Sequence, residues 1–340
     1  SGIGPIFSTY LGLTLAASLA ILAYKFDQVK SMNIFQSATG REASFLFNNL
    51  FFVVMAMTVI WGTLFPMLNE AVVHTKISVG PGFYNAIVPW VLLSLVVLMG
   101  VCIVLRWGTT STDELIRKLK YPSALTVASA PIFYLLGFSD IGSLIGLTAS
   151  VFAVSLHLED YVFDVRDYAR NKGIRIFSSM YRILLLRRRR YGGYIVHLSM
   201  FMIFIGLIGT TIYQTTHTST LQEDMPVDIA GYTITYEGFS VSEDPTQTEY
   251  IVRLLVSNGN GGGTLTARII EDHQTQSTRV SVGVLSLPFE DIYVIPESID
   301  QNQVSLTINY TPLIGFIWIG GQVMIIGVII SLLPKRWAER

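Results

Sequence analysis

Long apolar runs dominate this chain and alternate with short polar segments. Seven runs approach the length of about 20 residues at which a helix crosses the ~30 Å hydrocarbon core of a membrane. Pro131 interrupts the fourth run and only three residues separate it from the fifth, so we expect a tight helical hairpin there. The runs lie near residues 5–24, 43–68, 84–106, 122–138, 140–158, 191–213 and 312–333.

Residues 214–311 follow a second pattern, with apolar runs of strand length separated by Gly, Asn, Asp, Ser and Thr. Apolar residues alternate with polar ones in Tyr232–Tyr236 and again in Val304–Tyr310, as in half-buried strands. The glycine-rich run Asn258–Gly263 suits a hairpin tip, because glycine tolerates positive φ. We expect five to seven antiparallel strands in this segment.

The two patterns predict a membrane all-α bundle of about seven transmembrane helices, with one antiparallel β domain between the last two. Residues 1–213 form the first six helices and their cytoplasmic loops, 214–311 the β-rich domain, and 312–340 the final helix with a cytoplasmic tail. All but four of the 23 lysines and arginines fall on one side of this arrangement. Basic residues favour the cytoplasmic side, which places the N-terminus outside, the C-terminus inside and the β domain on the extracytoplasmic side.

Composition agrees with a membrane protein, since 51% of the 340 residues are hydrophobic and only 14% are charged. A net charge of -1 argues against a nucleic-acid surface. The single cysteine, Cys102, allows neither an internal disulfide nor a CxxC pair. The β-rich segment 214–311 is acidic, which indicates either a solvated surface or attraction of a basic partner. Because the chain starts at Ser1 without a leader-like segment, we expect a cut or processed start.

His197 is the one histidine of five that we place well inside a predicted span. It lies about seven residues into the sixth helix, roughly 10 Å from the cytoplasmic edge at 1.5 Å per residue. Lipid cannot satisfy an imidazole at that depth, so the ring either bonds to a neighbouring helix or ligates a metal or haem. We expect His157 at the cytoplasmic boundary of its helix, and therefore no second histidine at matching depth.

The neighbours of His197 are compatible with haem. Gly193, one turn earlier, leaves room for a flat macrocycle, and an apolar wall follows at helical spacing, although core stripes share that spacing. The wall consists of Tyr194, Met200, Phe201 and Phe204. Arg187–Arg190 indicates a positive-inside anchor, with pairing of Arg190 to a haem propionate as the alternative.

No other motif in the sequence indicates a catalytic or metal site. His74 lies in a short outer loop and is typical of a surface residue, while His217 and His273 lack the close spacing of a metal pair. No phosphate-binding loop, serine triad or HExxH motif is present in the sequence. Catalytic residues are therefore left unassigned.

Several strings resemble the CcmF family. Gly40–Leu50, Gly62–Pro66 and Ile77–Pro81 resemble the family blocks REAxxLxNN, GTLxP and (I/V)SVGPPFF. Arg187–His197 is similar to the family's basic stretch, tyrosine or glycine pair and transmembrane histidine, and Pro312–Gly321 resembles its last span. The resemblance covers essentially the whole chain and corresponds to the C-terminal half of the family.

The resemblance implies a haem lyase of cytochrome c maturation, which accepts haem from a haem chaperone and joins it to the CxxCH motif of apocytochrome c. It also implies haem b held by two transmembrane histidines, one of which matches His197. The implied partners are the N-terminal half of the lyase, the haem chaperone, and apocytochrome c with its thiol-handling maturation factors. The implied location is the bacterial inner membrane, with an organelle inner membrane also open.

The family's tryptophan-rich segment, both periplasmic histidines and its other transmembrane histidine precede the matched region. This chain alone is therefore expected to lack the substrate-haem site, and the N-terminal half is either a separate polypeptide or a missing portion of the same one. Gly82 stands where the family has proline. The rival interpretation is a non-enzymatic membrane receptor, transporter or scaffold subunit with an extracytoplasmic binding domain, which predicts no chromophore.

Overall fold

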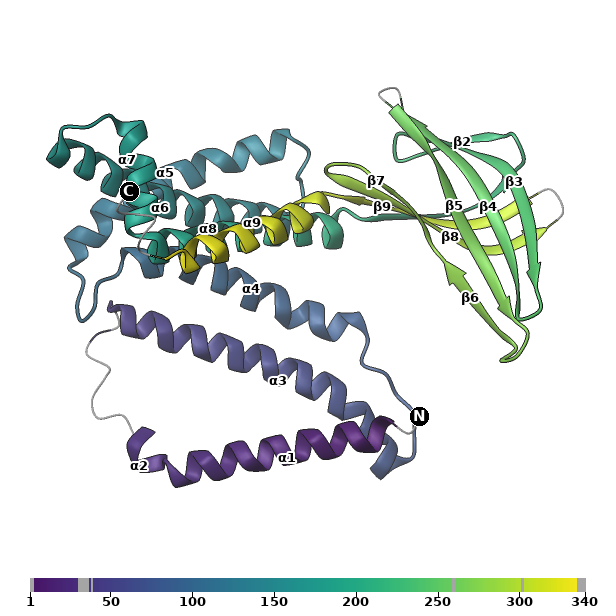
Figure 1. Cartoon of the computed structure of the whole chain (residues 1–340), viewed down its shortest axis with the longest axis horizontal. Helices are drawn as coiled ribbons and strands as arrows, with labels where there is room; N and C mark the ends of the chain where they lie inside the picture. Colours follow the sequence, from purple (N-terminus) through teal and green to yellow (C-terminus); the bar gives the residue numbers. More distant parts are fainter. Residues whose placement is uncertain (1–2, 30–36, 38, 259–260, 301–302, 335–340) are drawn as a thin grey trace. The chain divides into compact units, whose positions relative to one another are not determined.

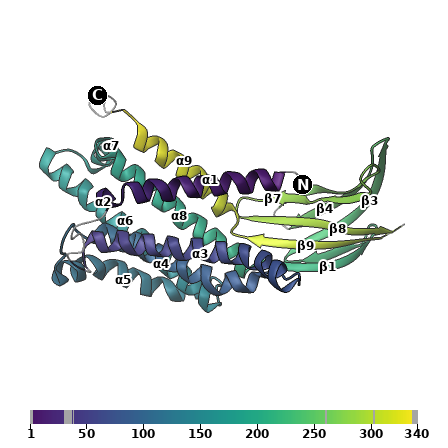
Figure 2. The same ribbon diagram turned by 90° about the horizontal axis from the view of Figure 1, so that it is seen from below.

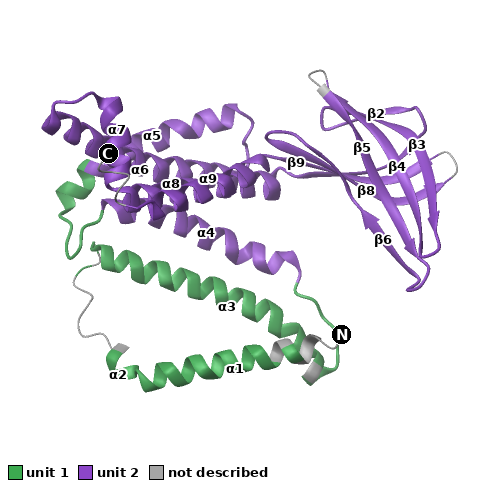
Figure 3. Cartoon of the chain, in the orientation of Figure 1, with its two compact units in different colours: residues 1–79, 105–117 green, residues 80–104, 118–340 purple. Residues whose placement is uncertain are grey.

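The computed structural model describes residues 3–29, 37, 39–258, 261–300 and 303–334 as helices, two β-sheets and their connections (Figure 1). They divide into two compact units (Figure 3). The first unit comprises Ser1–Val79 and Leu105–Arg117, and the second comprises Gly80–Val104 and Lys118–Arg340.

The first unit contains three helices and the start of a fourth. Its helices are α1 (Ile3–Tyr24), α2 (Phe26–Val29), α3 (Arg41–Val73) and the first residues of α5 (Thr112–Leu135). The first turn of α3 is tied to the segment that follows residue 104. The Arg41 N–H donates to the Arg106 carbonyl at 2.9 Å, and the Glu42 carboxylate accepts the Gly108 N–H at 2.9 and 3.1 Å.

The second unit contains the remaining helices and all described strands. Its helices are α4 (Pro81–Val104), most of α5, α6 (Ile141–Lys172), α7 (Ile176–Leu186), α8 (Arg188–Ile212) and α9 (Gly315–Leu332). Along the chain, the β domain lies between α8 and α9, as the hydrophobic pattern predicts.

Each of the seven predicted apolar runs lies on a helix, and five of the described helices are long and apolar enough to cross a membrane. These five are α3 over Arg41–Glu70, α4, α6, α8 and α9. The acidic and basic residues in the first turns of α5 shorten its apolar part. The chain is therefore a multi-pass membrane protein with a β domain, while the count of seven spans and their orientation stay predictions.

Two helices differ from the expected boundaries. Pro131 does not interrupt α5, which runs through it to Leu135. The helix expected over 140–158 continues as α6 to Lys172, where Gly173 ends it in the left-handed region with φ 64°. The charged residues after position 158 thus lie on the same helix as the apolar run. Charged residues end the apolar part of a helix, but they do not end the helix itself.

Helices α8 and α9 lie side by side in both views (Figures 1 and 2) and approach closely at two glycines. A Cβ on Gly327 would lie 2.9 Å from the Gly192 carbonyl oxygen and 2.9 Å from the Val196 nitrogen. Small residues let helix backbones approach in lipid, where dispersion contacts take the place of hydrophobic burial. Any side chain at Gly327 would therefore separate the two helices.

The β domain has nine strands among the described residues, more than the five to seven expected, and every ladder is antiparallel. One sheet has the order β1-β9-β8-β7, followed in Figure 2, and the other β2-β3-β4-β5-β6. The excess comes from β2, β6 and β7, which are only 4 or 5 residues long and too short to register as separate apolar runs. The strands are β1 (Thr215–Gln222), β2 (Pro226–Ile229), β3 (Tyr232–Asp244), β4 (Gln247–Asn258), β5 (Gly261–Asp272), β6 (Ser277–Ser281), β7 (Gly283–Ser286), β8 (Glu290–Asp300) and β9 (Gln303–Pro312).

Inward positions of both sheets form one core. The predicted alternation is observed in β3, where Tyr232, Ile234 and Tyr236 are buried, and in β9. The predicted hairpin joins β4 to β5, with Asn258 paired to Gly261, while its tip at 259–260 lies outside the described residues. This domain thus carries its own apolar core.

Candidate functional site

His197 lies on α8 and meets a second histidine, His157, on α6. His157 Nε2 and His197 Nδ1 are 2.9 Å apart, and the two rings are edge to face with centroids 5.1 Å apart. His157 is buried, at 6% exposure, and its Nδ1 lies 2.8 Å from the Ala153 carbonyl oxygen, one turn earlier on α6. The interpretation of His157 as an interfacial residue at a helix end, with no partner for His197 at its depth, was wrong.

The two histidines meet because α6 and α8 are long and antiparallel. Gly146 of α6 lies beside Ile208 of α8, His157 beside His197, and Asp164 beside Arg190, so residue numbers rise on one helix as they fall on the other. His157 is in the middle of α6 because that helix continues 14 residues beyond the predicted end at residue 158.

The hydrogen bonds assign the neutral tautomers of the pair. The Ala153 carbonyl only accepts, so His157 carries its proton on Nδ1 and leaves Nε2 bare. The 2.9 Å contact then requires that His197 donates from Nδ1, which leaves a lone pair on His197 Nε2. Within the described part of the chain, no hydrogen bond to His197 Nε2 is observed. His197 therefore presents one imidazole nitrogen that can bind a metal ion or accept a proton.

Aromatic residues surround His157. Tyr194 and Phe201 of α8 contact its ring edge to face, with centroids 5.0 and 5.3 Å away. These residues belong to a mostly apolar pocket of about 210 Å³ between α6, α7 and α8, which Leu184 and Tyr191 also line. The histidine pair is thus largely sheltered from polar groups other than its own.

The two neighbouring glycines of α8, Gly192 and Gly193, differ in the space around the position that a Cβ would take. A Cβ on Gly192 would lie 2.8 Å from the Gly327 carbonyl oxygen, whereas a Cβ on Gly193 would meet no atom within 4 Å. Gly193 is four residues before His197, on the same face of α8. An imidazole oriented by a hydrogen bond, with a bare Nε2 and a glycine without neighbours one turn earlier, is chemically suited to hold a haem iron.

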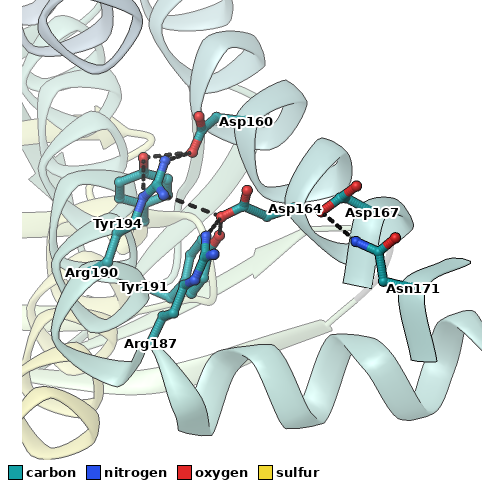
Figure 4. Close-up of polar contacts among 8 residues, drawn as sticks. All are labelled: Asp160, Asp164, Asp167, Asn171, Arg187, Arg190, Tyr191 and Tyr194. Atoms are coloured by element: carbon teal, nitrogen blue, oxygen red, sulfur yellow. Dashed lines mark hydrogen bonds and ion pairs between the residues drawn. The ribbon is translucent and has the colours of Figure 1, made fainter. Parts of the chain in front are cut away.

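Tyr194 also belongs to an ion cluster of six residues on α6 and around the start of α8 (Figure 4). The members are Asp160, Asp164, Arg187, Arg190, Tyr191 and Tyr194. The Asp164 carboxylate accepts from Arg187, from Tyr191 and, at 3.1 Å, from Arg190. Its side chain is only 16% exposed, so these charge-assisted bonds join α6 firmly to the α7–α8 corner.

Asp160 is the other acceptor of the cluster. It accepts from Arg190 at 2.6 Å and from the Tyr194 hydroxyl at 2.7 Å. Arg190 also donates from Nε to Tyr194 at 3.2 Å, so the guanidinium contacts two carboxylates and a phenol of this chain. Its predicted pairing with a haem propionate stays a prediction, and a propionate would compete with Asp160 and Asp164 for the same donors. The arrangement fixes Tyr194, and with it one wall of the histidine site.

The remaining predicted residues lie elsewhere. His74 is exposed and ends α3 in the left-handed region with φ 58°. His217 is exposed on β1, and His273 Nε2 is 2.9 Å from the Thr248 hydroxyl. The described residues contain no group of three or more His, Cys, Asp or Glu side chains suited to a metal ion. The site can therefore offer one ligand to a haem, but not a complete metal centre of its own.

Sequence reasoning missed His157, Asp160 and Asp164 as site residues. Their spacing of three and four places them on one face of a helix, and this signal is present in the sequence. It was missed because the helix over 140–158 was expected to end at residue 158, so no helix face was considered beyond that residue.

No family model matches the chain. CycK of Rhizobium meliloti, named a cytochrome c-type biogenesis protein, is 24% identical over 339 residues, which cover 98% of this chain and 49% of CycK. CcmF of Pseudomonas aeruginosa, also named a cytochrome c-type biogenesis protein, is 26% identical over 340 residues, covering 98% of this chain and 50% of CcmF. The chain spans about half the length of the curated relatives it matches, and that half is C-terminal.

A solved structure described as cytochrome c haem lyase CcmF superposes with a TM-score of 0.73 at 20% sequence identity. The superposition covers 97% of this chain and 51% of that one, so the two share a fold over nearly all of this chain. The resemblance inferred from the sequence motifs is thereby confirmed, and the chain is a relative of the CcmF and CycK cytochrome c-type biogenesis proteins that corresponds to their C-terminal half.

Proposed function

We propose that this chain is the C-terminal part of a membrane haem lyase of cytochrome c maturation. It holds a b-type haem through His197 and helps to attach haem covalently to the CxxCH motif of apocytochrome c. The bare Nε2 of His197 carries the proposal, because a hydrogen bond orients its ring and Gly193, one turn earlier on the same helix of the shared fold, has open space at its Cβ position.

The residues of the site have separate roles. His197 Nε2 would hold the haem iron, Gly193 would leave room for the macrocycle, and Tyr194 and Phe201 keep water from the imidazole pair. A haem b held there supplies one-electron redox chemistry. His157 has hydrogen-bond partners on both ring nitrogens, so any further protein ligand to the haem would come from the N-terminal half of the lyase.

The contribution of this chain to the lyase reaction is orientation. The thiols belong to apocytochrome c, and correct placement of two reactants removes much of the barrier to their reaction. The haem chaperone and the thiol-handling factors complete the proposed set of partners. With α8 entering the bacterial inner membrane from its basic cytoplasmic end, the acidic β domain lies outside, where it docks these partners.

The test is a preparation that contains both halves of the lyase, purified from bacterial inner membranes in mild detergent. Reduced absorption and pyridine haemochrome spectra are recorded for the wild type, His197→Ala and the control His217→Ala, which alters an exposed histidine on β1. We expect a non-covalent b-type signal that is lost only in His197→Ala. A preparation with both halves and no haem would exclude the ligand assignment and favour the receptor, transporter or scaffold interpretation.

A further inference from the structure

We propose that His157 is a positioning residue for His197: it fixes the tautomer and ring orientation of His197 and raises the basicity of its Nε2. This inference rests on the proposed function, because it assigns His157 a role toward the haem that His197 holds. His157 does not touch the haem in this proposal. It acts through one hydrogen bond, at 2.9 Å, to the ligand.

The first support is the direction of the hydrogen bonds. Ala153 O accepts from His157 Nδ1, and His157 Nε2 accepts from His197 Nδ1, so each ring has a single neutral tautomer. Metal-ligating histidines commonly donate their other N–H to such an acceptor, which orients the ring and strengthens the ligand. Without the acceptor, the His197 ring has no fixed tautomer, and either nitrogen could face the iron.

The second support is that His157 is itself held rigidly. It is 6% exposed, its Nδ1 is anchored one turn back on its own helix, and Tyr194 and Phe201 pack against its ring. Tyr194 is in turn bound to Asp160 at 2.7 Å, one turn further along α6. A rigid acceptor limits the motion of the ring that it binds, so the ion cluster supports the ligand indirectly.

The alternative role for His157, as the second axial ligand, does not fit the geometry. If each nitrogen bonded iron at about 2.0 Å, the usual length of a metal–imidazole bond, two ligands on opposite faces of a haem would have their nitrogens about 4 Å apart. The observed separation of 2.9 Å is a hydrogen bond, and the His197 atom that faces His157 is Nδ1, which carries the proton. His157 thus occupies the side of His197 opposite to the nitrogen that is available to iron.

The experiment uses the assembled lyase with both halves. His157→Leu removes the acceptor, His157→Gln keeps an acceptor oxygen near the position of Nε2, and Ser150→Ala is the matched control. Ser150 is buried on the same helix and its hydroxyl donates only to the Gly146 carbonyl of α6. Haem affinity is measured by titrating haem into the haem-depleted protein, and the midpoint potential by spectroelectrochemistry, with the absorption spectrum reporting coordination.

We expect His157→Leu to bind haem about 10–100-fold more weakly. Its midpoint potential rises, because a less basic ligand stabilises the ferric iron less. Its absorption spectrum shows the same iron coordination as that of the wild type. His157→Gln restores most of the affinity and shows a smaller rise in potential, and Ser150→Ala matches the wild type. If His157→Leu does not assemble, a raised potential in His157→Gln supports the proposal and an unchanged potential overturns it.

Two results would overturn the positioning role while leaving the proposed function intact. Unchanged affinity and potential in His157→Leu would show that the hydrogen bond does not act on the ligand. Loss of one axial ligand from the spectra of both His157 variants would show that His157 binds iron itself. Retention of haem by His197→Ala, by contrast, would overturn the proposed function, so the two failures are distinguishable.

Discussion

The β domain and the helical part of this chain are stabilised in different ways. Among the described residues, the β domain buries fifteen side chains in one continuous core, whereas the helices have two small clusters of three buried residues each. On α9, large apolar side chains such as Trp318, Ile325 and Ile329 are more than half exposed. Water drives apolar side chains into a core, but lipid is itself apolar, so the helices gain little by burying them from it.

Polar contacts show the same difference in another form. In the β domain, the Glu290 carboxylate on β8 accepts from Tyr232 and Tyr310 and thereby links the two sheets beside an apolar core. Between α6 and α8, the histidine pair and the ion cluster are a large part of the contact itself. In lipid a polar group must find a partner within the protein, so polar pairs specify which helices meet and in which register. On the helices, the candidate site and the contacts that pack α6 against α8 are thus formed by the same residues.

The largest effect that we expect comes from the core of the β domain. Leu254 on β4 is fully buried, while its neighbour Leu255 points outward and is 40% exposed. Leu254→Ala lowers the free energy of unfolding of the domain by about 2–5 kcal/mol, because it removes transfer energy and leaves a cavity. Leu255→Ala, the matched control, changes it by about 0.5 kcal/mol or less. Hydrogen exchange of the β3–β5 amides in the whole chain measures both, and equal effects would contradict a single water-driven core.

Among changes to the helices, we expect the largest loss of stability from one that disturbs the close contact between α8 and α9. Gly327→Val places atoms against the Gly192 carbonyl and the Val196 backbone and separates α8 from α9, at a cost of about 3 kcal/mol, the upper end of the usual range for overpacking. Gly321→Val is the control on the same helix, because a Cβ there meets no atom within 4 Å. The two variants are compared by heating each in detergent and measuring the fraction of protein that stays monodisperse at each temperature. Equal melting temperatures would mean that glycine contact does not hold α8 to α9.

A smaller effect is expected in the ion cluster. Asp164→Asn removes the charge that Arg187 and Arg190 share and weakens the contact of α6 with the α7–α8 corner by about 2 kcal/mol. Asp167→Asn, one turn away on the same helix, alters an exposed aspartate that contacts Asn171 (Figure 4) and should change stability by about 0.5 kcal/mol or less. The thermal melts of the two variants, at low and high salt, measure the difference. An Asp164 variant that melts like the Asp167 variant would show that the cluster does not stabilise the corner.

What the sequence predicted correctly is what local periodicity determines. Each apolar run lies on a helix, and the alternating runs that include Tyr232 and Val304 lie on strands, because both periods are properties of about ten consecutive residues. His197 was singled out by a similar count along one helix, and it lies on α8, while its depth in the membrane stays a prediction. The short strands escaped because four residues carry too little pattern.

What the sequence did not predict depends on register between distant segments. The contact of His157 with His197 requires α6 to continue past residue 158 and to pack antiparallel to α8, which no local pattern determines. The two neighbouring glycines make the same point. Gly192 packs against α9 while Gly193 has open space, and only the position of α9 distinguishes them.

The smallest effect concerns the polar link inside the β domain. Burial, followed by the Glu290 carboxylate that accepts its hydrogen bond, raises the pKa of Tyr232 from 10.0 to about 12. Because the folded-state pKa is above the unfolded value, the protonated phenol stabilises the fold below about pH 10, and this contribution is lost as the pH rises through about 12.

Near-ultraviolet phenolate absorbance, recorded for the wild type and for Tyr232→Phe, isolates the titration of Tyr232 by difference. In Glu290→Gln the oxygen that accepts from Tyr232 is kept and the negative charge is removed, so the Tyr232 transition should move to lower pH but stay above 10.0, since burial is unchanged. A transition at the same pH in both backgrounds would mean that burial alone sets the pKa. The negative charge of Glu290 would then add nothing to the link between the two sheets, and a neutral acceptor would serve equally well. The aspartates of the helical cluster differ in this respect, because their charge is proposed to hold α6 against α8.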